Sequence, residues 1–191
     1  TLDYQLRDVC SKQTSRSNFL EDYIMINVGD RIPEVYMPIR VDGDWVLLNT
    51  TTQFEGKRVV IFALPGAFTP TCSSFQLPGF ETMFSQFQEK GIDEIYCLSV
   101  NDSFVMNSWF ETQGIQNVRP LPDGNGEFTE LVGASVKKAN VGFGIRSWRY
   151  AMVINDNVVE QVFAEDGFGD NIENDPYEVS TPENVLENLS N

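Results

Sequence analysis

Apolar positions follow two kinds of pattern through the middle of the chain. Residues 58–64 and 94–100 are short runs with β-branched and aromatic side chains, which are typical of buried strands. Residues 69–90 and 103–113 instead place apolar side chains at helical spacing, and a glycine directly follows each segment. The pattern therefore predicts strands that alternate with helices.

Turn residues between apolar runs predict two hairpins. Asp-Gly separates residues 35–41 from residues 45–48, and Asn-Asp-Asn separates residues 150–154 from residues 158–163. Both connections are typical of turns between antiparallel strands. Between the hairpins, a short helix is predicted over residues 127–132, directly after the turn Asp-Gly-Asn-Gly.

The order of these elements predicts an α/β fold. A closing helix is predicted over residues 182–189, with Thr181 as its N-cap. Strands that alternate with helices, followed by a hairpin and a helix, predict a mixed central sheet flanked by helices, thioredoxin-like in its order. Residues 1–28 show no clean period, so we predict an N-terminal extension there and one thioredoxin-like domain over residues 29–191. A chain of 191 residues with 41% hydrophobic side chains can build one sizeable core.

The charged residues narrow the function classes. The chain contains no histidine, and its 13 Lys and Arg against 28 Asp and Glu give a formal net charge of −15. Without histidine, a Ser-His-Asp triad, a Cys-His pair and a His-bearing zinc site are excluded. The acidic balance argues against binding to nucleic acid or to an anionic membrane surface, because both require cationic side chains. Small neutral substrates and protein partners remain.

The cysteines and the apolar runs indicate the compartment. Cys10, Cys72 and Cys97 are an odd number, and no two of them have the spacing of metal ligands or of a CxxC redox pair. This usage indicates a reducing compartment rather than a disulfide scaffold. No apolar run approaches the ~18 residues of a membrane span, and the start of the chain lacks the basic-then-apolar order of a signal peptide. We therefore expect a soluble cytoplasmic protein with no metal, nucleotide or haem cofactor.

Cys72 is the cysteine placed for chemistry. It lies at the start of the helix predicted over residues 69–90, directly after an apolar strand. Thr69 is a natural N-cap and Pro70 a natural first helical residue, which puts Cys72 in the first turn. Free backbone N–H groups and the positive end of the helix dipole favour a thiolate there. On position alone, the alternative is a small buried residue at a helix start.

The loop before Cys72 reads PGAFTPTC over residues 65–72. Its prolines make it rigid, Gly66 allows the backbone to approach a ligand, and the Thr69 hydroxyl lies three residues before the sulfur. Such a hydroxyl can donate to and accept from a small diatomic substrate. In a thioredoxin-type site the position of Thr69 would carry a second cysteine, so no local disulfide is expected at Cys72.

This loop resembles the peroxidatic motif of peroxiredoxins, specifically of the type 5 group with its glutaredoxin-linked hybrid branch. Pro65, Thr69 and Cys72 occupy the family's Pro, Thr and peroxidatic Cys positions, and the resemblance extends over residues 29–189. Three further segments match in the same order: CLSVND at residues 97–102, DGNGEF at residues 123–128 and RSWRYAM at residues 146–152. The resemblance implies a thioredoxin-like fold and the reduction of hydrogen peroxide or alkyl hydroperoxides by a cysteine that becomes a sulfenic acid.

The resemblance also implies roles for two arginines. Arg149 matches the arginine that reaches the peroxidatic sulfur, so a fixed positive charge takes the place of an imidazole beside the thiolate. Arg146 is a candidate for substrate binding, together with the backbone near Gly66. From the residues alone, an arginine beside the strand at residues 150–154 would be taken for a surface residue.

The reduction of the sulfenic acid requires a second thiol. Type 5 members with a resolving cysteine carry it in the region that here spans residues 163–180, which contains none. Cys97 lies mid-strand and is expected to be a core thiol, and Cys10 could resolve only if the extension folds back. We therefore expect a one-cysteine cycle with glutathione, glutaredoxin or thioredoxin acting in trans, and the family implies a homodimer. The alternative is a thioredoxin-like redox sensor or binding module that signals through Cys72.

The acidic residues gather near the end of the chain. Residues 155–191 contain ten acidic residues and no Lys or Arg. Such a run is either a solvated surface or a docking surface for a basic partner. We expect it to lie away from the loop that carries Cys72, and so to affect solubility and docking rather than peroxide chemistry.

Overall fold

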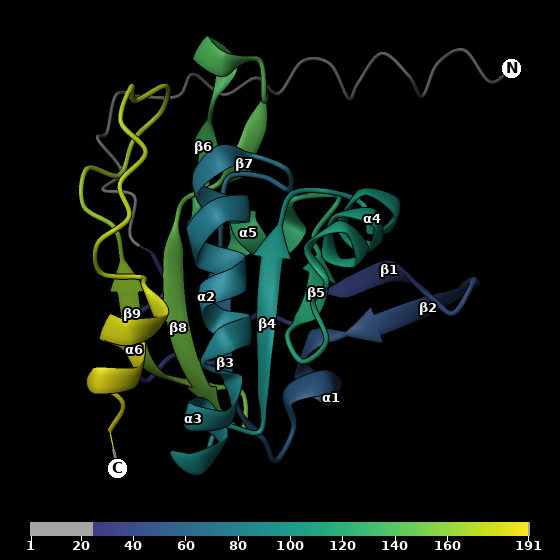
Figure 1. Ribbon diagram of the computed structural model, residues 1–191, viewed down its shortest axis with the longest axis vertical. Helices are drawn as coiled ribbons and strands as arrows, with labels where there is room; N and C mark the ends of the chain where they lie inside the picture. The colour runs from purple at the N-terminus through teal and green to yellow at the C-terminus, as the bar shows by residue number, and fades with distance from the viewer. Residues whose placement is uncertain (1–24, 191) are drawn as a thin grey trace, which may run out of the picture.

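A mixed sheet of five strands forms the centre of the protein (Figure 1). The computed structural model describes residues 25–190, so Cys10 and the rest of residues 1–24 lie outside the described residues. The division of the chain after residue 28 stays a prediction. In chain order the elements are β1 (Tyr36–Val41), β2 (Asp44–Asn49), α1 (Thr50–Phe54), β3 (Arg58–Ala63), the π turn η1 (Cys72–Gln76), α2 (Leu77–Thr82), α3 (Phe84–Glu89), β4 (Glu94–Ser99), α4 (Ser103–Gln113), β5 (Arg119–Pro122), α5 (Glu127–Leu131), β6 (Ser135–Lys137), the 3₁₀ turn η2 (Ala139–Val141), β7 (Ile145–Ser147), β8 (Tyr150–Asn155), β9 (Val158–Ala164) and α6 (Pro182–Glu187).

The central sheet has the strand order β5-β4-β3-β8-β9. β3 runs parallel to β4 and antiparallel to β8, and two further strands extend the sheet, β5 parallel to β4 and β9 antiparallel to β8. The hairpins β1–β2 and β6–β7 form separate two-stranded sheets. This is the mixed sheet expected from the element order, and no helix within residues 25–190 is long and apolar enough to cross a membrane.

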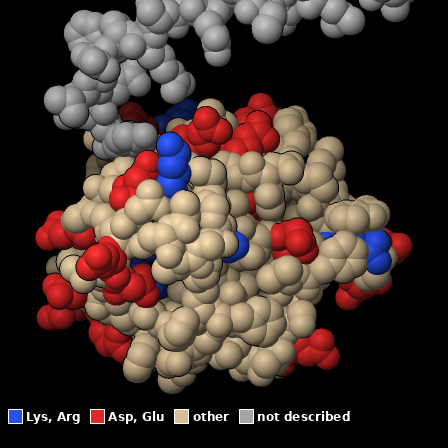
Figure 2. All heavy atoms as spheres, turned by 90° about the horizontal axis from the view of Figure 1, so that it is seen from above, with Lys and Arg blue, Asp and Glu red and all other residues tan. Residues whose placement is uncertain are grey.

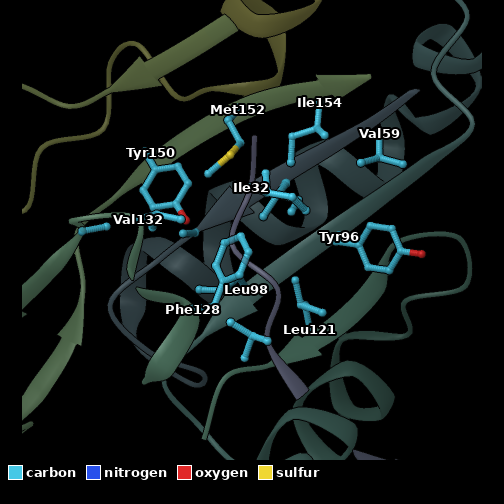
Figure 3. Close-up of a cluster of buried hydrophobic side chains, with 14 of the residues drawn as sticks. Ile32, Val59, Tyr96, Leu98, Leu121, Phe128, Val132, Tyr150, Met152 and Ile154 are labelled. Carbon is cyan, nitrogen blue, oxygen red and sulfur yellow. The ribbon is translucent and has the colours of Figure 1, made fainter. Parts of the chain in front are cut away.

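The core has two parts, one on each face of the sheet, because successive side chains of a strand point to opposite faces. In β3, Val60 and Phe62 join a cluster completed by α2, α3, α4 and α6, whereas Val59 and Ile61 join a cluster completed by α1 and α5. Helices α2, α3 and α6 lie in front of the sheet in Figure 1. Figure 3 shows the second cluster, where Phe128 of α5 lies among side chains of the strands. The central strands are therefore buried on both faces.

Both predicted hairpins are confirmed. β1 and β2 pair across Asp42 and Gly43, whose φ angles are 50° and 90°. β8 and β9 pair across Asp156 and Asn157, whose φ angles are 45° and 68°. A two-residue hairpin turn of this kind needs positive φ at both central residues, which Asp, Asn and Gly tolerate best.

Three predicted helices are also confirmed. α4 has the predicted bounds and ends at Gly114, which adopts the left-handed conformation with φ 68°. α5 begins at Glu127 as predicted. α6 begins at Pro182, and the hydroxyl of Thr181 accepts a hydrogen bond from the backbone N–H of Asn184.

The single helix predicted over residues 69–90 is wrong in detail, because the chain forms a π turn, α2 and α3 instead. The N–H of Leu77 donates to the carbonyl of Cys72, five residues earlier, and Pro78 has no N–H with which to continue the regular ladder. Met83, at φ −94° and ψ 5°, then separates α2 from α3. The spacing of apolar residues could not predict this interruption, because it does not register that Pro78 lacks a backbone N–H.

The sequence pattern did not predict β5. This strand lies at one edge of the sheet and carries Pro120 and Pro122. Proline cannot donate to a ladder, so it normally argues against a strand, but an edge strand tolerates it where the missing donor faces away from the neighbouring strand. α1, β6 and β7 are also absent from the prediction, because three to five residues are too few for a periodic signal.

Glu81 of α2 ties the loop before β5 to the helix. Its carboxylate accepts hydrogen bonds of 2.9–3.1 Å from the backbone N–H groups of Gln116, Asn117 and Val118. Partial burial raises the pKa of Glu81, but these bonds to the ionised form outweigh burial and hold the pKa below its ordinary value of 4.5. These hydrogen bonds, here called the Glu81 clamp, therefore stabilise the fold fully above pH 4.5. Their contribution is lost as the pH falls through the lowered pKa of Glu81.

We expect Glu81→Gln to lower the free energy of unfolding at neutral pH by about 1 kcal/mol, because the carboxylate is the stronger acceptor. Urea unfolding measured at neutral pH and again in acid should show the difference from wild type shrinking as the pH falls through the lowered pKa of Glu81. Glu89→Gln, at an exposed position of α3, is the matched control. A deficit of equal size at both pH values would contradict the clamp.

Candidate active site

Cys72 lies at the carboxyl end of β3, where the loop of residues 65–72 enters the π turn. The backbone N–H of Ser73 donates to the carbonyl of Thr69, which starts the helical turn. The Cys72 side chain is fully buried and packs in the apolar cluster on the α2 face of the sheet. A thiol in this place is reached by small molecules alone unless the chain around it moves.

Arg149 reaches the sulfur from the other side of the site. It precedes β8, its side chain is 2% exposed, and its Nη1 lies 3.5 Å from Cys72 Sγ. Burial lowers the pKa of Arg149, but the negative charges of Cys72 and Asp175 outweigh burial and raise it above its ordinary value. A permanent positive charge therefore lies next to Cys72 at a position buried from solvent.

Three further residues hold the Arg149 guanidinium. Nη1 donates to Gln76 Oε1 in the π turn, and Nη2 donates to Asp175 Oδ1 at 2.7 Å. The ring of Tyr177 lies 5.6 Å from the guanidinium carbon. Sequence reasoning missed all three, and it placed Asp175 in an acidic run expected to lie away from the site. That expectation is wrong.

Asp175 reaches the site because of the path that the chain follows after β9. Residues 165–180, here called the acidic strap, fold back over the end of the sheet and return at Ser180. Glu165 holds the strap closed, since its buried carboxylate accepts hydrogen bonds from the backbone N–H groups of Glu178, Val179 and Ser180 and from the Ser180 hydroxyl. The strap has no periodic pattern of apolar residues that would predict its return to the sheet. The one signal in the sequence is the presence of apolar residues among the acidic ones.

Thr69 and Gly66 shape the loop. Thr69 holds the predicted N-cap position directly before Pro70, but its hydroxyl donates to the carbonyl of Gly66 at 2.7 Å and so stabilises the loop. A Cβ at Gly66 would lie 2.9 Å from Arg146 Nη1 and 3.3 Å from Thr69 Cγ2, and this crowding explains the glycine. Phe68 adopts φ 63°, a left-handed conformation that a bulky residue takes only under strain.

Arg146 holds the loop and lies against Pro65 and Gly66. Its Nη1 is 3.3 Å from the carbonyl of Pro65 and 3.3 Å from Asn101 Oδ1, and its Nε donates to the carbonyl of Phe143. Asn101 Oδ1 also accepts from the N–H of Ala67, so it fixes the loop from a second side. The contact of Asn101 with the loop is a further feature that the sequence did not reveal.

Cys97 is buried in β4, as predicted for a core thiol. Burial, with a smaller contribution from the nearby Cys72, raises the pKa of the Cys97 thiol well above 9.0. It therefore stays protonated near neutral pH and is a poor nucleophile. Within residues 25–190, no group of three or more His, Cys, Asp or Glu side chains is arranged to hold a metal ion.

The surface around the site is largely uncharged or acidic. Figure 2 views the end of the molecule towards which β4 points in Figure 1, and uncharged residues cover most of it. Acidic side chains gather in groups around this area, and few basic side chains are visible. Such a face does not repel a neutral hydroperoxide, whereas it is unfavourable for a polyanion.

Comparison with known proteins decides the family. The family model described as Redoxin matches residues 27–180. A peroxiredoxin from Rhizobium etli is 59% identical over 145 residues, which cover 76% of this chain and 81% of that protein. The chain belongs to the peroxiredoxin family. Peroxiredoxins are thiol-dependent peroxidases, so the chain acts on peroxides with thiol reductants.

Two other similarities refine the placement within the peroxiredoxins. The hybrid peroxiredoxin hyPrx5 of Haemophilus influenzae is 44% identical over 162 residues, covering 85% of this chain and 66% of that protein. The crystal structure of the Plasmodium falciparum antioxidant protein, a 1-Cys peroxiredoxin, superposes with a TM-score of 0.82 at 36% identity, covering 85% of this chain and 97% of that one. The resemblance to type 5 peroxiredoxins and the thioredoxin-like fold, both predicted from the sequence, are confirmed.

Proposed function

We propose that the chain reduces hydrogen peroxide and alkyl hydroperoxides through Cys72. The thiolate attacks the terminal peroxide oxygen, the S–O bond forms as the O–O bond breaks, and the departing oxygen takes a proton and leaves as water or an alcohol. Cys72 is thereby oxidised by two electrons to a sulfenic acid. The observation that carries this proposal is the 3.5 Å contact between Arg149 Nη1 and Cys72 Sγ inside a buried site.

Arg149 has two roles in this proposal. Its charge stabilises the thiolate, and its N–H groups stabilise the negative charge that develops on the separating oxygens. The buried Nε of Arg149 and Nε2 of Gln76 have no hydrogen-bond partner within the described residues. The Gln76 side chain contacts the same Nη1 that faces Cys72, so we expect its Nε2 to donate to a peroxide oxygen beside the sulfur.

The loop residues complete the site. The Thr69 hydroxyl donates to Gly66, which leaves its oxygen free to accept a hydrogen bond from the peroxide. The buried Pro65 keeps the loop rigid, and the backbone N–H groups near Gly66 and Cys72 bind the oxygens. Arg146 supports the loop through Pro65 and so acts on substrate binding indirectly.

For the return to the thiol, a one-cysteine cycle is the simplest proposal. Cys97 is fully buried, Cys10 lies outside the described residues, and the acidic strap contains no cysteine. Glutathione with glutaredoxin, or thioredoxin, would then reduce the sulfenic acid in trans. The similarity to a hybrid and to a 1-Cys peroxiredoxin supports this cycle, and a cytoplasmic homodimer remains the expected form.

The mass of the protein after peroxide treatment tests the cycle. Without reductant, we expect the peptide that contains Cys72 to gain one oxygen atom in wild type and equally in Cys97→Ala. A loss of two hydrogens, with Cys72 linked to Cys10 or Cys97, would overturn the one-cysteine cycle. Peroxide consumption is then followed with glutathione and glutaredoxin, and separately with thioredoxin and its reductase. Oxidation of one equivalent without turnover in either system would favour the redox sensor instead.

A further inference from the structure

We propose that Asp175 is a positioning residue for peroxide reduction, whose carboxylate holds the Arg149 guanidinium so that Nη1 faces Cys72. This inference rests on the proposed function, because it concerns the orientation of the group that acts on the thiolate and the peroxide. Asp175 lies 26 residues beyond Arg149 in the chain, in a segment whose composition indicates a solvated surface or a docking surface rather than part of the site.

Because the guanidinium is rigid, the contact of Arg149 with Asp175 determines where Arg149 meets Cys72. Arginine presents its N–H groups in a rigid planar fork, so fixing one terminal nitrogen fixes the direction of the other. Nη2 is held by Asp175 Oδ1 at 2.7 Å, and Nη1 then points to Cys72 Sγ and Gln76 Oε1. The contact with Asp175 is charge-assisted at both ends, which makes it the stronger anchor compared with the amide oxygen of Gln76.

The strap is built to hold Asp175 in place. The Glu165 carboxylate binds three successive backbone N–H groups at residues 178–180, a short distance after Asp175. The backbone N–H of Glu165 in turn donates to the carbonyl of Arg149. The same residue therefore connects the strap to the backbone that carries the arginine, and the side chain of Asp175, although 44% exposed, is delivered by an anchored segment.

If Asp175 acted only through its charge, its removal would make Cys72 more reactive, which is the opposite of what the positioning role predicts. Asp175 and the Cys72 thiolate are both anionic and flank the same guanidinium, so removal of the Asp175 charge would relieve repulsion and favour the thiolate. Positioning predicts that removal of the charge releases Arg149 and leaves the thiolate without its partner. Because the two predictions differ in sign, one variant can separate them.

The test is the second-order rate constant for oxidation of Cys72 by hydrogen peroxide in Asp175→Asn, measured by stopped flow on the full chain. We expect a roughly tenfold loss, because a neutral amide replaces a charge-assisted acceptor. The acid limb of the pH–rate profile should move to higher pH. Of the groups that face Arg149, Tyr177 does not titrate in this range, because burial, and then the charge of Glu183, raises its pKa.

Two further variants complete the design. Asp175→Glu keeps the charge and should recover most of the wild-type rate, since the side chain is partly exposed and has room to adjust. Glu173→Gln removes one charge from an exposed position of the same strap and should leave both the rate and the profile unchanged. A structural defect alone would appear as reduced stability in urea unfolding without the shift of the profile.

An Asp175→Asn variant that reacts as fast as wild type, or faster, would overturn the positioning role while leaving peroxide reduction intact. If wild type itself fails to react with peroxide at Cys72, the proposed function fails instead. The two failures are therefore distinguished in one experiment.

Discussion

Cys72→Ser is expected to reduce peroxide consumption at least about a thousandfold, to the background rate. The serine hydroxyl has almost the same size, so the buried position tolerates it, but it is not ionised near neutral pH and forms no sulfenic acid. The contact with Arg149 at 3.5 Å cannot compensate, because a guanidinium stabilises an anion only where one forms. Peroxide consumption in the presence of an excess of reductant measures the loss.

Cys97→Ala is the matched control for this variant. Cys97 is fully buried, and its raised pKa keeps the thiol protonated, so its removal should leave the rate of peroxide consumption unchanged. The variant is compared with wild type for its free energy of unfolding, since loss of a buried sulfur leaves a small cavity. Equal activity of Cys72→Ser and wild type would refute the assignment of the nucleophile.

Replacing Arg149 is expected to have the second largest effect. Arg149→Met removes the charge but keeps a long side chain, and we expect a loss of about 10²–10³-fold in the rate of Cys72 oxidation, as for deletion of one oxyanion donor. Arg149→Lys keeps the charge, yet a single ammonium cannot reach Cys72, Gln76 and Asp175 together. We therefore expect Arg149→Lys to lie much closer to Arg149→Met than to wild type.

Arg31→Lys serves as the control for a conservative change of an arginine, because Arg31 is exposed. It should react with peroxide at the wild-type rate. Stopped-flow oxidation without reductant isolates this step from recycling. An Arg149→Lys variant with wild-type rate would mean that the charge, and not the fork geometry, is what the site requires, and it would weaken the role inferred for Asp175.

The order of helices and strands could be predicted from the sequence because it depends on local patterns. The strand β3 and the helix α4 each carry their signal within their own residues, as apolar content or as a cap at Gly114. The π turn at Cys72 depends on Pro78, whose effect is exerted on the preceding turn, so the apolar period could not indicate it. Local sequence patterns therefore predict the presence of helices and strands more reliably than they predict irregularities such as the π turn.

The candidate site was only partly predictable for a related reason. Cys72 and Thr69 stand in one short loop, where the residue types themselves indicate the chemistry. Arg149 follows from the resemblance to a family, since its contact with the sulfur spans 77 residues of sequence. Asp175 reaches the site through a segment without periodic structure, and its composition points to solvent. The spacing of hydrophobic residues therefore cannot predict a contact that an irregular segment makes when it folds back onto the sheet.

The two prolines of β5 have a consequence for the behaviour of the protein at high concentration. An open sheet edge with unpaired N–H groups is a template on which strands of other molecules can add, and this is a common start of aggregation. Pro120 and Pro122 are two residues apart, so their missing donors lie on the same side of the strand. This edge of the sheet is therefore protected against β-pairing between molecules.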